Sequence, residues 1–166
     1  MKRQIRTAEK LLVLGLSLIL IFMVVQDLVP LGPLNDVDAI SEDRSFNEIL
    51  TVTLIGTVQI LILLSIVLLF MGKRYPIWIR LWLVIHQSFI FVGALIDWWI
   101  PYFFGFGAEE RVERYQQMFG ETHAFLPEIN GIVPNTLHVI FHSLLLLCIL
   151  LTIYISFTTK NKNHLA

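Results

Sequence analysis

The sequence predicts an all-α membrane protein, a bundle of four transmembrane helices in one domain that covers residues 1–166. Hydrophobic residues make up 56% of the chain and charged residues only 15%, and the mean hydropathy is +0.73. A soluble domain of this size needs more polar side chains to cover its surface. Four apolar runs also reach the roughly 20 residues that a helix needs to cross the hydrocarbon core of a bilayer.

The first predicted span runs from about Leu11 to Leu28, directly after a basic segment. A secretory signal peptide begins in the same way. However, this apolar stretch is long, and it ends in Gln26 and Asp27 where a signal peptide would carry small residues for cleavage. We therefore expect an uncleaved membrane anchor.

The second and third spans, about Phe46 to Met71 and about Ile77 to Phe104, are joined by the short turn 72–76. So short a turn forces the two helices to be antiparallel neighbours. Pro76 fits the start of the third helix, where a missing N–H group costs nothing. Aromatic residues cluster at both ends of this helix, as they do at the two interfaces of a bilayer.

The fourth span runs from about Pro134 to Phe157, and the two longer loops cover about residues 29–45 and 105–133. Within the second loop, apolar residues recur at helical spacing from Val112 to Phe119, with charged residues on the opposite side. This pattern predicts a short amphipathic helix that either lies on the outer interface or caps the bundle.

Charged residues are divided between the two ends of the spans. Lysine and arginine precede the first span, flank the turn between the second and third, and follow the fourth: Lys2, Arg3, Arg6, Lys10, Lys73, Arg74, Arg80, Lys160 and Lys162. The two longer loops carry most of the acids. By the positive-inside rule, we expect both termini in the cytoplasm, the two acidic loops outside, and a multi-pass protein of the cell membrane.

Several kinds of function are excluded. Cys148 is the single cysteine, so an intramolecular disulfide and Cys-based zinc or redox motifs are ruled out. Its place inside an apolar run is typical of a small core residue. The sequence has no Gly-rich phosphate loop and no basic stripe of the kind that binds nucleic acid.

Ionisable side chains inside the spans are the candidates for a functional site, because they are costly to place in a membrane. His138 and His142 lie four residues apart and share one face of the fourth helix. The third helix carries a stripe of His86, Ile90, Gly93, Asp97 and Pro101. At about 1.5 Å per residue, Asp97, His138 and His142 lie within roughly 12 Å of the outer ends of their helices, so we expect them to converge.

Other polar residues surround this cluster. Asp27 and Glu48 lie near the outer ends of the first and second spans, and we expect them at the rim of the same cavity. The expected inward stripe of the second helix is Glu48, Thr51, Ile55 and Gln59. Glu121 and His123, in the second outer loop, either close over Asp97 and His138 as a lid or belong to a solvated surface loop.

A b-type haem is disfavoured. Its axial ligands would be His86 and a histidine of the fourth helix, but His86 and His142 differ by roughly 10 Å in depth. We expect His86 to pair with Gln59 or with a backbone carbonyl instead.

Three interpretations of the Asp97, His138 and His142 cluster stay open. The imidazoles can act as interhelical glue, each donating one hydrogen bond that fixes helix register. They can bind a divalent transition metal, with Asp97, Glu48 or His123 as a further ligand, although the H-x-x-x-H spacing lacks the glutamate of the zincin signature. Without a metal, the same groups can form a pocket that binds a small or lipid-derived ligand or moves a proton during its conversion.

Two classes of function follow from the sequence. In the first, the protein binds a ligand in the outer half of the bundle, with or without acting on it. In the second, it is a non-catalytic membrane subunit, such as an immunity, assembly or accessory factor, whose acidic outer loops contact a partner. Its partners are then the lipid bilayer and either another membrane protein or a second copy of the chain.

Overall fold

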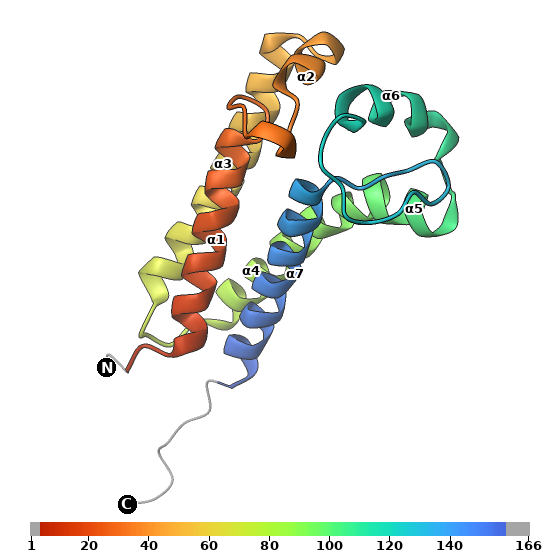
Figure 1. Cartoon of the computed structure of the whole chain (residues 1–166). Helices are drawn as coiled ribbons and strands as arrows, with labels where there is room; N and C mark the ends of the chain where they lie inside the picture. The colour runs from red at the N-terminus through yellow and green to blue at the C-terminus, as the bar shows by residue number, and fades with distance from the viewer. Residues whose placement is uncertain (1–3, 159–166) are drawn as a thin grey trace, which may run out of the picture.

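The computed structural model of the chain is all-helical and describes residues 4–158 (Figure 1). Four of its helices are long and apolar enough to cross a membrane: Thr7–Val25, Phe46–Phe70, Ile77–Phe104 and Thr136–Phe157. The sequence therefore located all four spans, with bounds that differ by a few residues. The basic residues Lys2, Arg3, Lys160 and Lys162, which entered the prediction of orientation, lie outside the described residues.

The spans form a curved row in the order α3 (Phe46–Phe70), α1 (Thr7–Val25), α7 (Thr136–Phe157) and α4 (Ile77–Ala94), since α1 packs on both α3 and α7, and α7 packs on α4. α3 and α4 meet at their connecting turn, where the Tyr75 hydroxyl donates to the Val67 carbonyl at 3.3 Å. Beyond the turn the two helices diverge (Figure 1). They are antiparallel as expected, but they pack on α1 and α7 rather than along each other.

Close packing of α1 against α7 forms the centre of the row. A Cβ atom on Gly15 would lie only 2.6 Å from Sγ of Cys148, so glycine is what allows the two backbones to approach. Further along, the rings of Phe22 and Phe141 stack with centroids 4.4 Å apart. Cys148 is fully buried, which agrees with its interpretation as a small core residue.

The terminal end of the row, where α1 begins, α7 ends and the α3–α4 turn lies, is closed by two arginines. Arg6 donates to the Ile155 carbonyl at 3.1 Å, and Arg80 donates to the Ser156 carbonyl at 2.8 Å. These carbonyls are near the C-terminus of α7, where the helix lacks its own donors and its dipole attracts cations. The arginines therefore tie α1 and α4 to the end of α7.

The third span is interrupted by a π-helical turn, η2 (Leu95–Trp99), between α4 and the short helix α5 (Ile100–Phe104). Pro101 has no N–H group, so the Asp97 carbonyl loses its usual donor four residues on. The Ile100 N–H reaches back to the Leu95 carbonyl, five residues away, which is the π-type bond. The Tyr115 hydroxyl takes the freed place and donates to the Asp97 carbonyl at 3.0 Å.

The opposite, loop end carries the remaining short helices. The first loop contains η1 (Gly32–Leu34) and α2 (Val37–Asp43), and the second contains α6 (Glu109–Phe119). α2 packs against α6, so the two loops meet over the ends of the spans (Figure 1).

Candidate functional site

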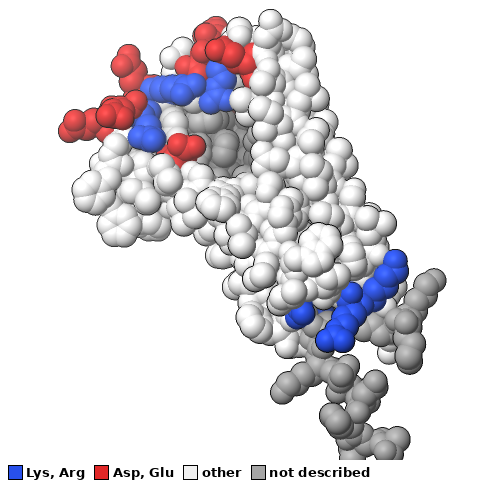
Figure 2. Space-filling view, turned by 180° about the vertical axis from the view of Figure 1, so that it is seen from behind, with Lys and Arg blue, Asp and Glu red and all other residues white. Residues whose placement is uncertain are grey.

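A half-enclosed cavity of about 130 Å³ lies at the loop end, beneath α2 and α6. We call it the loop-end cavity; its lining residues are Gln26, Asp27, Ile40, Arg44, Val52, Asp97, Trp98, Tyr115, Met118, Phe119 and His138. Figure 2 shows a hollow at this end of the molecule with charged residues around it. Three of the five predicted cluster residues, Asp27, Asp97 and His138, therefore line one cavity.

His138 is held in place by the residue that begins its own helix. Asn135 is the N-cap of α7, and its Oδ1 accepts the backbone N–H of His138 at 3.0 Å. The same oxygen lies 2.6 Å from Nδ1 of the imidazole, so Nδ1 is the protonated nitrogen of the neutral ring and Nε2 is left as an acceptor. The ring stacks on Trp98 at 4.6 Å and meets Phe119 edge-on at 5.1 Å.

Asp97 does not face the two histidines as expected. The prediction assumed a regular α-helix. A π turn contains one residue more than an α-helical turn, so the side chains that follow it point in different directions from those of a regular helix. Trp98 therefore points inward and is only 6% exposed. The Asp97 side chain is 63% exposed, and its Oδ1 lies 3.7 Å from Nη2 of Arg111. Asp97 thus stands at the mouth of the cavity, while Trp98 contacts both imidazoles.

Asp27 follows α1 and is partly buried at the side of the cavity. Its carboxylate accepts a long hydrogen bond from Gln26 at 3.4 Å. Burial raises the pKa of Asp27, and the nearby positive charge of Arg44 opposes that rise. Arg44, which was not predicted as a site residue, is thus the cation that this carboxylate faces across the cavity.

Ion pairs between α2 and α6 form the roof of the cavity. Arg114 binds Asp43 through two nitrogens, with the shortest distance 2.8 Å. This hydrogen-bonded pairing lowers the pKa of Asp43 and raises that of Arg114. Arg44 also approaches Asp43 at 3.6 Å. The roof is therefore built from charged groups of both loops.

Glu48 lies outside the cavity. Its carboxylate accepts the Ser45 N–H at 2.8 Å and the Ser45 hydroxyl at 2.7 Å, so it forms a capping box at the start of α3. The predicted inward face of α3 is also wrong, because the buried residues are Ile49, Thr53, Ile60, Leu63 and Val67. This helix is apolar on all sides, so its few polar residues did not mark its packed face.

Glu121 and His123 do not cover the cavity. The His123 N–H donates to the Pro33 carbonyl at 2.6 Å, and its carbonyl accepts the Thr136 N–H at 2.9 Å. The imidazole Nδ1 lies 2.7 Å from the Thr136 hydroxyl. His123 thus joins the first loop to the start of α7. Glu121 lies beside Asp36 and Asp38 on the surface; the cover over His138 comes from α2 and α6.

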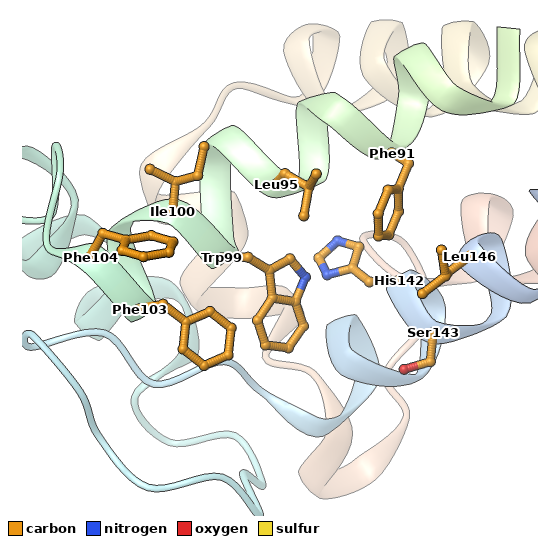
Figure 3. Close-up of a pocket in the computed structure, with 9 residues that line it drawn as sticks. All are labelled: Phe91, Leu95, Trp99, Ile100, Phe103, Phe104, His142, Ser143 and Leu146. Carbon is orange, nitrogen blue, oxygen red and sulfur yellow. The ribbon is translucent and has the colours of Figure 1, made fainter. Parts of the chain in front are cut away.

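His142 lies in a second cavity, on the side of the protein between the third span and α7 (Figure 3). We call this the lateral groove; it has a volume of about 380 Å³ and is lined by Phe91, Leu95, Trp99, Ile100, Phe103, Phe104, His142, Ser143 and Leu146. His142 is only 4% exposed. The centroids of the His138 and His142 rings are 6.0 Å apart, yet the two rings face different cavities.

A metal site is not supported within residues 4–158, because no three His, Cys, Asp or Glu side chains gather closely enough to hold an ion. Asp97, the third predicted ligand beside His138 and His142, is turned toward Arg111. His86 stacks on Trp82 at 4.8 Å, and its Nε2 is buried without a partner among the described residues, so the expected hydrogen bond to Gln59 or to a backbone carbonyl is not seen for this nitrogen.

Sequence reasoning missed the residues that shape these sites. Asn135 was recognisable as an N-cap from its place before an apolar run, and Pro101 was recognisable as a helix breaker. No local pattern identified Arg44 or Tyr115, because each reaches the cavity from a loop helix that packs there only in the folded chain. Gln87 was also missed; it is buried and donates to the Thr152 hydroxyl at 3.0 Å between α4 and α7.

No family model matches the chain, and no curated protein or solved structure matches it either. Its function is therefore inferred from the loop-end cavity and the lateral groove themselves.

Proposed function

We propose that the chain is a multi-pass membrane protein that binds a small polar ligand in the loop-end cavity, with that end facing outward. The observation that carries this proposal is the convergence of Asp27, Arg44, Asp97 and His138 on one cavity. These residues come from four separate segments. Ionisable groups gathered in a concave site are the usual mark of ligand binding.

The charges favour a ligand that carries both signs. Asp27 and Asp97 suit a cationic group, while Arg44 suits a carboxylate or another anion. Trp98 and Tyr115, whose centroids are 4.5 Å apart, form an aromatic wall beside these charges. A volume of about 130 Å³ is below the roughly 300 Å³ of the smallest common drug-sized pockets. An amino-acid-sized zwitterion meets these conditions.

His138 supplies a hydrogen-bond acceptor to this ligand. Because Asn135 fixes the proton on Nδ1, the Nε2 lone pair is available to an ammonium or hydroxyl group. No chemical step is included in the proposal.

Binding is tested by thermal unfolding of the detergent-purified protein with free amino acids added one at a time. We expect at least one to raise the melting temperature in a saturable manner. Asp27→Asn should weaken that ligand roughly tenfold or more, the range for a lost charge-assisted hydrogen bond. Glu113→Gln, on the exposed face of α6, is the matched control and should bind as the original protein does.

The pH dependence gives a second test of the same site. Burial raises the pKa of Asp27, so binding of a cationic group should strengthen as the pH rises through that raised value. Affinity that stays constant from acidic to neutral pH, or equal affinity in Asp27→Asn, would contradict the proposal.

Labelling of Glu113→Cys by a membrane-impermeant maleimide in intact cells tests the outward orientation.

A further inference from the structure

The lateral groove shares no lining residue with the loop-end cavity, so it is a separate site. We propose that it binds the ring of an uncharged isoprenoid quinone, whose ring carbonyl accepts a hydrogen bond from His142. The proposal concerns binding alone and does not depend on the ligand of the loop-end cavity.

The hydrogen bonding of the His142 imidazole favours a ligand in the groove. The ring contacts Trp98, Trp99, Phe141 and His138, but within residues 4–158 no hydrogen bond reaches it. A buried polar group without a partner is unfavourable in a protein and more so in a bilayer. Figure 3 shows the imidazole reaching into the groove toward Trp99. A ligand with an acceptor oxygen there completes its hydrogen bonding.

The aromatic lining of the groove favours a flat ring. Four of the nine lining residues are Phe91, Trp99, Phe103 and Phe104. Trp99 and Phe103 stack at 5.7 Å, and the Trp99 ring meets the His142 ring edge-on at 6.0 Å. Aromatic side chains arranged in this way favour a flat ring, which gains stacked and edge-to-face contacts that a flexible chain does not make.

The depth of His142 in the membrane favours an uncharged ligand. α7 has 22 residues, so its length of about 33 Å matches the hydrocarbon core and its first residue lies near the membrane boundary. His142 is six residues further along, about 9 Å into the hydrocarbon. Charged headgroups and the ester groups beside them stay at the interface. This depth favours, as the partner of His142, a polar atom of an uncharged molecule that enters the bilayer core, as a quinone ring does.

The groove is continuous with the surface that faces the lipid. Phe104 and Leu146, on opposite sides of the opening, are 69% and 41% exposed. Side chains on the lipid-facing surface of α4, such as Phe89 and Val92, are exposed as well. A quinone can thus enter sideways from the membrane, with its isoprenoid tail left among the lipid chains.

The test is equilibrium binding of a tritiated, prenylated naphthoquinone to the full chain in lipid nanodiscs. We expect saturable binding of one quinone per chain. Leu146→Trp, which fills the groove, should weaken binding at least tenfold. Leu147→Trp is the matched control, because Leu147 is similarly exposed, at 49%, and does not line the groove.

A second pair of variants tests the hydrogen bond and avoids the added bulk. His142→Leu should weaken binding roughly threefold to tenfold, the effect of one lost hydrogen bond. His86→Leu removes an imidazole from the other half of the third span and should have no effect. Equal binding by the Leu146→Trp and Leu147→Trp proteins, or by the His142→Leu and His86→Leu proteins, would overturn the proposal. Displacement of the quinone by palmitate at similar concentration would show an acyl-chain site instead.

Discussion

The two ends of the protein use charged residues in opposite ways. At the terminal end, Arg6 and Arg80 bond backbone carbonyls of α7, and the helices pack on a hydrophobic core. At the loop end, Arg44, Arg111 and Arg114 face carboxylates, and a cavity remains beneath them. Arginine that bonds backbone carbonyls holds helices together at any pH, whereas arginine that pairs with carboxylates loses its partner when the carboxylate is protonated.

The largest effect is expected at the packed centre of the row. Gly15→Ala places a Cβ 2.6 Å from the Cys148 Sγ, so the Cys148 side chain or the α1–α7 packing must shift, and we expect a loss of roughly 1 to 3 kcal/mol of stability. The measurement is thermal unfolding in detergent. Gly93→Ala is the control, because nothing lies within 4 Å of the added Cβ. A similar loss in both variants would mean that the α1–α7 approach does not limit stability.

A smaller effect is expected at the π turn. Tyr115→Phe removes the hydroxyl that donates to the Asp97 carbonyl, which Pro101 has already deprived of its usual donor. An unsatisfied carbonyl costs roughly 1 kcal/mol or more, although water at the cavity mouth reduces this. Hydrogen exchange should quicken at η2 and α6, with no change at α1. Unchanged exchange at η2 would show that this hydroxyl does not support the turn.

The smallest effect is expected at the roof, and it depends on pH. Arg114 lowers the pKa of Asp43, so the stabilisation is complete above the ordinary aspartate pKa of about 4 and is lost as the pH falls through the lowered value. The protection of α2 and α6 amides against hydrogen exchange, measured relative to the intrinsic exchange rate at each pH, should therefore fall on acidification. The pair is near the surface and contributes at most about 1 kcal/mol. In Asp43→Asn this protection should be low already at neutral pH and should not change further on acidification.

The identities of several residues of the candidate site could be predicted from the sequence, but the arrangement of their side chains could not. His138 was located by its place near the start of an apolar helix, and Asp27 by its place at the end of one. Asp97 was predicted to point inward because a regular α-helix would place it on the same face as His86. The π turn changes that spacing, so Trp98 points inward instead. Glu48 was predicted at the rim of the cavity from its depth along the second span. Its carboxylate instead accepts hydrogen bonds from the N–H group and the hydroxyl of Ser45 at the start of α3.

The sequence by itself determined the four spans, because length and hydropathy decide whether a helix can cross a bilayer. The tertiary structure decided which side chains meet. In a helix that is apolar on all sides, such as α3, any face can contact lipid, so only packing against α1 decides which face is buried. The neighbouring histidines likewise share one face of α7, and it is the inserted residue of η2 that directs Trp98 to His138 and Trp99 to His142.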